Sequence, residues 1–176
     1  MGKRSNFPRR PQDAYDTPAE AVPALIPHLV GVRTYAEPCA GNGFLIRHLN
    51  SFGLECAYSS DIKEGVDALE VADFGKIDAV ISNPPWTRDV LHPMILHFQA
   101  IAPTWLIFDA DWAFTGQAAP FLDQCSHIVS VGRLKWIPGT KFTGKESCAW
   151  YRFHAQHVGG PKLIGKRPRS ELAVAA

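Results

Sequence analysis

Short apolar runs of strand length alternate with stretches of helical periodicity along most of this chain. The strand-like runs lie at residues 34–36, 56–59, 77–81, 105–108, 127–131 and 148–153. Helical stretches are predicted at 44–49, 89–101 and 117–124. A Thr17-Pro18-Ala19-Glu20 capping box predicts an earlier helix to about Val30, with kinks at Pro23 and Pro27. Strands separated by helices form mainly parallel sheets that bind ligands at their carboxyl edge. The sequence therefore predicts an α/β fold of this kind.

Length and composition are those of one globular domain. The chain has 176 residues, 46% of them hydrophobic and 20% charged, which is enough to bury a core. No apolar stretch approaches the roughly 20 residues of a membrane span, and the polar, basic first residues lack the apolar core of a signal peptide. The four cysteines and seven histidines show no metal-ligand spacing. We expect a cytoplasmic protein with free thiols, no metal and no membrane partner.

The net charge of +1 averages over unlike segments. Residues 1–10 carry four basic residues and no acid, residues 162–176 carry four basic residues and one acid, and the body between them is acidic. We expect a flexible basic arm at 1–12, a single domain at 13–157 and a flexible basic tail at 158–176. Such arms suit either contact with a phosphate backbone or ordinary solvation of the chain ends.

A third basic run lies inside the domain and has aromatic residues within it. Its members are Arg133, Lys135, Lys141 and Lys145, with Trp136 and Phe142 between them. Cations contact phosphates and rings stack on bases, so the four basic residues are candidates for nucleic-acid binding. A solvated loop with two rings in the core fits the same pattern.

A glycine-containing turn follows the first predicted strand. It reads Glu37-Pro38-Cys39-Ala40-Gly41-Asn42-Gly43, and its glycines let a ligand approach the backbone. Asp61 lies 18 residues beyond Gly43, about where nucleotide-binding α/β units place the acid that holds ribose hydroxyls. The turn has no lysine and Glu37 would repel a pyrophosphate. A ligand with a ribose and a positive centre fits better, and S-adenosylmethionine has both.

Two further motifs follow in order along the chain. Asp73 and Phe74 could take an adenine ring through a hydrogen bond and stacking, or serve as a cap and a core residue. Asn83-Pro84-Pro85-Trp86 ends the next strand. Prolines lack N–H groups and stiffen the turn, so the Asn83 amide oxygen and the Pro84 carbonyl could accept both hydrogens of an exocyclic amine. Trp86 offers a flat face to the ring that bears this amine.

Together these motifs resemble the class I methyltransferases that methylate amino groups with S-adenosylmethionine, most closely the DNA adenine-N6 methyltransferases. The resemblance implies a Rossmann-like, mainly parallel sheet with an antiparallel final strand and helices on both faces. It implies cofactor contacts from Tyr15, Thr17, Glu37, Pro38, Gly41, Gly43, Asp61, Ile62, Asp73, Phe74 and Asn83. It assigns the target amine to the catalytic motif Asn83, Pro84, Pro85 and Trp86. Residues 133–136 and 150–153 resemble the family's final hairpin-like strands.

The chain departs from this family in having no room for a separate target-recognition region. Asn83 lies only 10 residues after Asp73. Sequence choice would then come from loops 86–92 and 136–147, from the basic arms, or from a second subunit in a homodimer. The predicted partner is nucleic acid, DNA in particular. Methylation of RNA adenine or of a protein glutamine remains open, as does a catalytically silent nucleic-acid-binding module on the same fold.

Overall fold

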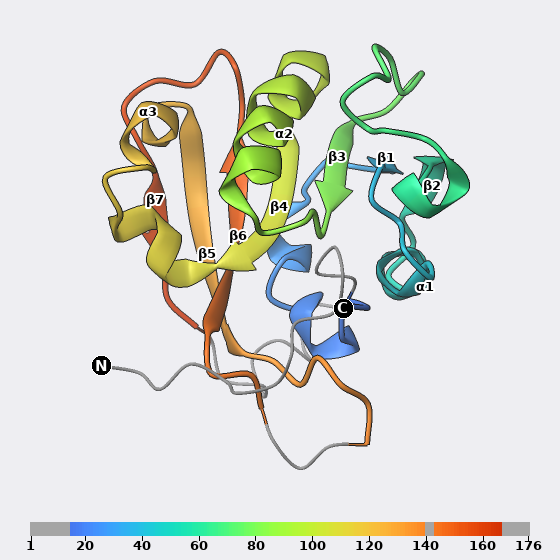
Figure 1. Cartoon of the computed structure of the whole chain (residues 1–176), viewed down its shortest axis with the longest axis horizontal. Coiled ribbons are helices and arrows are strands. Elements are labelled where there is room, and N and C mark those ends of the chain that lie inside the picture. The colour runs from blue at the N-terminus through green and yellow to red at the C-terminus, as the bar shows by residue number, and fades with distance from the viewer. Residues whose placement is uncertain (1–14, 140–142, 167–176) are drawn as a thin grey trace.

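The computed structural model describes residues 15–139 and 143–166, and a seven-stranded sheet runs through them in the order β2-β1-β3-β4-β6-β5-β7 (Figure 1). The strands are β1 (Thr34–Glu37), β2 (Glu55–Ser59), β3 (Ala79–Ser82), β4 (Thr104–Asp109), β5 (Cys125–Arg133), β6 (Ser147–Phe153) and β7 (Lys162–Ile164). Strands β1 to β4 pair in parallel, and β6 runs antiparallel between β4 and β5. The predicted α/β fold class is confirmed.

The helices are mostly short. They are η2 (Ala19–Ala21), η3 (Ile26–His28), α1 (Phe44–Asn50), η4 (Ile62–Glu64), α2 (Arg88–Ile101), η5 (Ala110–Phe114) and α3 (Ala119–Leu122). The single helix predicted from the capping box to Val30 is wrong, because the segment forms the two separate 3-10 turns η2 and η3. Pro23 and Pro27 cannot donate the backbone hydrogen bonds that a continuous α-helix needs.

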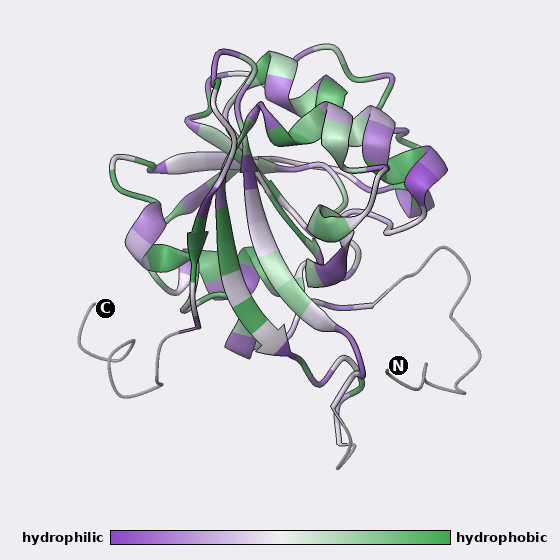
Figure 2. Ribbon diagram, turned by 90° about the vertical axis from the view of Figure 1, so that its left-hand side faces the viewer, coloured by the Kyte–Doolittle hydropathy of each residue, from purple (hydrophilic) through white to green (hydrophobic). Residues whose placement is uncertain are grey.

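Two apolar layers cover the two faces of the sheet. On one face, α2, η5 and α3 pack over alternate strand residues such as Val80, Leu106 and Tyr151. On the other face, α1 and the segment with η2 and η3 pack over Tyr35 and Trp150 with their neighbours. Figure 2 shows green, apolar residues alternating with paler, more polar ones along the strands. This period of two along each strand is expected of a sheet buried on both sides.

The sheet extends beyond the predicted end of the domain at residue 157. Strand β7 pairs in parallel with β5, with Lys162 opposite His127 and Ile164 opposite Val129. The prediction of a flexible tail from residue 158 is therefore wrong for this strand, and the antiparallel β6 is not the last strand. The physical reason is that Ile164 packs against the core although basic residues surround it in the sequence.

The carboxyl ends of the parallel strands meet at one edge of the sheet. Strands β1 and β3 end there at Glu37 and Ser82, and β4 ends at Asp109. Because β6 is antiparallel to both β4 and β5, β5 also ends at this edge, at Arg133. Within residues 15–139 and 143–166, no helix has the length and apolar character that crossing a bilayer requires.

Candidate cofactor and substrate site

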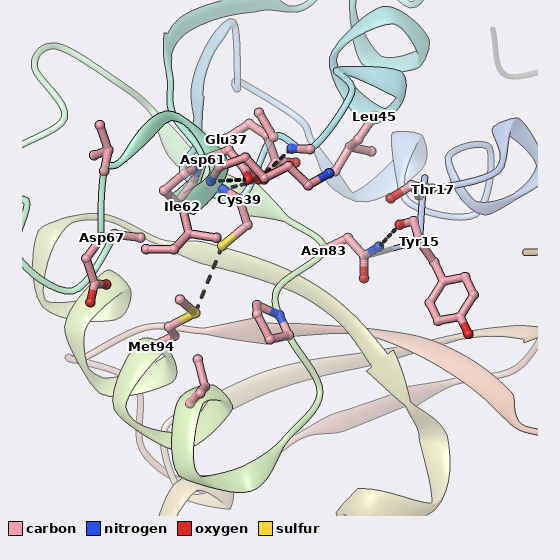
Figure 3. Close-up of a pocket in the computed structure, with 18 of the residues that line it drawn as sticks. Tyr15, Thr17, Glu37, Cys39, Leu45, Asp61, Ile62, Asp67, Asn83 and Met94 are labelled. Carbon is pink, nitrogen blue, oxygen red and sulfur yellow. Dashed lines mark hydrogen bonds between the residues drawn. The ribbon is translucent and has the colours of Figure 1, made fainter. Parts of the chain in front are cut away.

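A cavity of about 360 Å³ opens at the carboxyl ends of β1 and β3 (Figure 3). The predicted cofactor residues that line it are Tyr15, Thr17, Glu37, Pro38, Gly41, Asp61, Ile62 and Asn83. They come from four separate segments of the chain. Figure 3 shows Asp67 toward one end of the pocket and Tyr15 toward the other, with Glu37 and Asp61 between them. The fold thus gathers most of the predicted residues around one space.

The glycine turn after β1 lines this cavity. Gly41 has a φ of 54° and Gly43 a φ of 71°, a left-handed conformation that side chains disfavour. The Gly41 N–H donates to Asp61 Oδ2 at 2.7 Å, and the Ala40 N–H donates to the Ser60 carbonyl at 2.9 Å. The turn is therefore tied to the end of β2. Gly43 is the residue that caps α1, and it does not itself line the cavity.

Glu37 is a buried acid that faces the cavity with only 1% of its surface exposed. Its Oε1 accepts hydrogen bonds from Ser82 Oγ at 2.5 Å and from the Cys39 N–H at 3.1 Å. Burial raises the pKa of Glu37 to about 8, the two hydrogen bonds partly oppose this, and the nearby charge of Asp61 adds to it. With these neighbours alone, the carboxyl is protonated near neutral pH. A cation bound beside it would favour the ionised form.

Asp61 caps the short helix η4 and lies at the cavity wall. It is 7% exposed, and its Oδ1 accepts from the Lys63 N–H at 3.0 Å. Each oxygen therefore has one backbone donor and keeps a lone pair for a hydroxyl ligand. Ile62 is half exposed and lines the rim next to it.

Asp73 and Phe74 do not line the cavity. Phe74 is buried between Tyr58 and Phe98, with ring centroids 4.9 Å and 5.9 Å away. Asp73 is exposed and accepts from the Gly75 N–H at 2.8 Å in a local turn. Phe74 is therefore a core residue, as the alternative expects, whereas Asp73 caps no helix and only closes a local turn. Asp67, Ala68 and Leu69 line the cavity instead.

The Asn-Pro-Pro-Trp motif lies where β3 ends and before α2 begins. The Asn83 Nδ2 donates to the Tyr15 carbonyl at 3.2 Å, and the Trp86 Nε1 donates to Asn83 Oδ1 at 3.2 Å. Asn83 and Pro85 line the cavity, whereas Pro84 is buried and Trp86 lies outside the cavity lining. The amide oxygen predicted to accept the target amine thus already accepts the indole N–H.

Three aromatic side chains gather beside this motif. The Trp86 ring meets the Trp136 ring edge-on, with centroids 5.5 Å apart. The Tyr15 ring also meets the Trp136 ring edge-on, with centroids 6.4 Å apart. The Gly144 N–H donates to the Leu134 carbonyl at 2.7 Å, which closes the loop that carries Trp136. Trp136 was absent from the predicted site residues. The sequence signal that could have identified it is its position between basic residues, which is typical of a ring that stacks on a base.

The basic residues predicted to contact nucleic acid lie at the same edge of the sheet. Arg133 ends β5, and Lys135 and Lys145 are exposed in the loop that follows. Lys141 lies outside the described residues. Lys166 belongs to the basic tail and not to the internal basic run. Its ammonium lies so close over Gly132 that an added Cβ there would be 2.8 Å from Nζ. Cationic side chains from β5, its loop and the end of β7 therefore share one edge with the cavity.

Among the described residues, no group of three or more His, Cys, Asp or Glu side chains could hold a metal ion.

No protein-family model and no curated protein matches this chain, but several solved structures do. A protein from Pyrococcus horikoshii, proposed to be an RNA methyltransferase, matches with a TM-score of 0.52 and 19% identity over 89% of this chain and 93% of its own. The methyltransferase subunit of a type I restriction-modification system from Streptococcus thermophilus matches with a TM-score of 0.55 and 12% identity. That match covers 86% of this chain and 47% of the subunit.

A third structure is proposed to be a class I S-adenosylmethionine-dependent methyltransferase from Listeria monocytogenes. It matches with a TM-score of 0.55 and 11% identity over 84% of this chain and 62% of its own. At these identities the likeness concerns the arrangement of the backbone. The chain has the Rossmann-like fold of class I methyltransferases.

Proposed function

We propose that this chain is an S-adenosylmethionine-dependent N-methyltransferase that acts on an exocyclic amino group, with adenine N6 in DNA as the first candidate. The observation that carries the proposal is the position of Asn83. Its carboxamide lines the same cavity as Glu37 and Asp61, so one space offers both cofactor ligands and an amine acceptor. A rigid turn that only ended a strand would not need this arrangement.

The cavity fits the chemistry of the cofactor. Bound there, S-adenosylmethionine would supply a methyl group activated by a sulfonium. The buried Glu37 carboxyl would face the cationic end of such a ligand, and the Asp61 lone pairs would accept its ribose hydroxyls. Asp67, rather than Asp73, is then the carboxylate available to the adenine amino group. Gly41 lets the backbone approach the ligand without a side chain.

The chain's part in the reaction is to hold the target amine. An adenine amine is a poor nucleophile because its lone pair is delocalised into the ring. Acceptance of an amine hydrogen by Asn83 Oδ1 would favour the tetrahedral nitrogen of the transition state. The remaining gain is alignment of the amine with the methyl group. A base within a duplex would have to flip out to reach this position.

The Trp86 indole orients the acceptor that the target amine needs. Its Nε1 donates to Asn83 Oδ1. An amide oxygen has two lone pairs, so one remains for an amine hydrogen of the target. A flipped base that stacked on the Trp86 ring would use this lone pair while the indole holds the carboxamide in place.

Two observations support nucleic acid as the substrate. Arg133, Lys135 and Lys145 lie at the same edge as the cavity, and phosphates are bound by such cations. An RNA adenine is the second candidate, because the Pyrococcus horikoshii structure that aligns over most of both chains is proposed to be an RNA methyltransferase. DNA stands first on the motif resemblance.

Incubation with tritiated S-adenosylmethionine and either DNA, RNA or protein tests the proposal. We expect label in nucleic acid, recovered as N6-methyladenosine or its deoxy form after digestion. Asn83→Ala should abolish transfer and leave cofactor affinity, measured by calorimetry, within a few-fold of wild type. Normal turnover in this variant would contradict the assignment. Cofactor binding without transfer to any substrate would favour a silent binding module.

A further inference from the structure

A row of cationic side chains crosses three strands near the amino-terminal edge of the sheet, beside Trp105 on β4. Trp105 pairs with Arg152 on β6, Arg152 pairs with His127 on β5, and His127 pairs with Lys162 on β7. Directly paired residues point to the same face of a sheet. Arg152, His127 and Lys162 therefore stand side by side on the face that also carries Trp105.

The row is partly covered by the segment before β1. The His28 ring of η3 lies 6.2 Å from the Trp105 ring and 6.2 Å from the His127 ring, centroid to centroid. The Arg152 Nη1 donates to Ser126 Oγ at 3.0 Å, and the same oxygen lies 3.0 Å from His127 Nδ1. A neutral, buried hydroxyl thus joins the guanidinium to the imidazole and holds both in place.

Within the residues that the structure describes, no carboxylate contributes to the electrostatic environment of Arg152 or of His127. Burial alone lowers the pKa of Arg152, with no carboxylate contributing. Burial also lowers the pKa of His127, and the further causes are all cationic: Arg152, His28, Lys162 and His157. A half-buried guanidinium without an anion is costly. An anion bound at this row would relieve that cost and would favour the protonated form of His127.

We propose that Arg152, His127 and Lys162, with His28 beside them, form a phosphate-binding site separate from the cofactor cavity. The planar Arg152 fork can donate two parallel hydrogen bonds to phosphate oxygens, and Lys162 adds an exposed point charge. Trp105 lies four residues before Asp109, where β4 ends at the same edge of the sheet as the cavity. Because a strand rises about 3.3 Å per residue, the row is roughly 13 Å from that edge. The site does not depend on methyl transfer.

The phosphate could belong to a nucleic-acid backbone or to a free small molecule. For a ligand whose charge is constant with pH, such as a phosphodiester backbone, protonation of His127 adds positive charge to the row, so affinity rises as pH falls through the range of histidine titration. The groups facing His127 are Arg152, His28, Lys162 and His157. None of them is an acid, and lower pH therefore adds charge to this row without neutralising a partner in it.

Titration of the full chain with inorganic phosphate, followed by the NMR signals of the histidine rings, tests the site. We expect saturable shifts of the His127 and His28 signals. With sulfate, whose charge does not change over this range, we expect an affinity several-fold higher at pH 6 than at pH 7.5. Arg152→Gln and Lys162→Gln should each weaken binding, about tenfold for Arg152. Lys76→Gln, an exposed lysine elsewhere, is the matched control and should bind as wild type. Circular dichroism checks that each variant is folded.

Lys162 is exposed, so the second variant keeps the test valid if Arg152→Gln fails to fold. The absence of a saturable shift, or equal affinity in wild type and Lys162→Gln, would overturn the site. A second titration with a duplex DNA distinguishes the two sources. If DNA shifts the same signals and phosphate competes with it, the ligand is the backbone. If only inorganic phosphate shifts them, the ligand is a free phosphate compound.

Discussion

Replacement of Glu37 by glutamine tests the electrostatics of the cavity. The pKa of this carboxyl is about 8 in the folded protein against 4.5 without the fold, and its burial is the main cause. Between these values the folded state holds a proton that the unfolded state has lost. The stability of the protein therefore falls through this group as pH rises from 4.5 toward 8. Below 4.5 both states hold the proton, and the pH dependence from Glu37 ends.

The size of the effect follows from the shift. One pKa unit corresponds to about 1.4 kcal/mol, so the group costs roughly 1 kcal/mol at pH 5 and roughly 4 kcal/mol at pH 8. A glutamine side chain is uncharged at every pH and keeps an oxygen that can accept from Ser82. We expect the free energy of unfolding of Glu37→Gln, relative to wild type, to rise by about 3 kcal/mol between pH 5 and pH 8.

Urea unfolding followed by tryptophan fluorescence at several pH values measures this difference. All other titrating groups are common to both proteins, so the comparison isolates Glu37. Parallel pH profiles for wild type and variant would refute the argument. A second measurement uses the ligand: if the cation of S-adenosylmethionine stabilises ionised Glu37, binding at pH 7 releases about one proton. Calorimetry in buffers of different ionisation enthalpy detects this, and Glu37→Gln should lose it.

Three further predictions concern the turn, the indole and the basic edge. Gly41→Ala places a side chain at a φ of 54° and should lower the free energy of unfolding by about 1 to 2 kcal/mol, which urea titration measures. Trp86→Phe removes the N–H that donates to Asn83 Oδ1 but keeps a ring on which a base can stack, so kcat should be retained. Trp86→Ala also removes the ring, and should raise KM for the nucleic acid by about 10- to 100-fold through lost stacking. An equal KM in both variants would argue against stacking on this ring. Arg133→Gln should weaken nucleic-acid binding for all sequences alike and reduce the salt dependence by about one charge, as measured by fluorescence anisotropy at several salt concentrations.

Local patterns were sufficient for β1 to β6 and for the two main helices, α1 and α2, but not for β7. Apolar runs such as 105–108 and 148–153 lie inside β4 and β6, because a buried strand needs continuous apolar side chains whatever its neighbours are. The early helix failed because the capping box is a local signal for a start, and Pro23 and Pro27 then interrupt the hydrogen bonding that the helix would need.

A local motif was a less reliable guide to the residues that line the cavity. Asp73-Phe74 has the composition of an adenine site, yet Phe74 packs between two rings and Asp73 closes a local turn. A composition shared by a core residue and a ligand contact cannot distinguish them, because both bury an aromatic face. Asp67, which lines the cavity, carries no motif at all.

The sequence by itself determined the order of strands along the chain, the glycine turn after β1 and the proline-stiffened turn after β3, because each depends on the conformational limits of nearby residues. Only the tertiary structure decided which distant side chains meet. Trp86, Trp136 and Tyr15 come from three segments, and the cationic row joins β6, β5 and β7 through the register of their pairing. The order of strands in the sheet and their register arise from packing of the whole sheet. A short stretch of sequence does not specify which strand will pair with it.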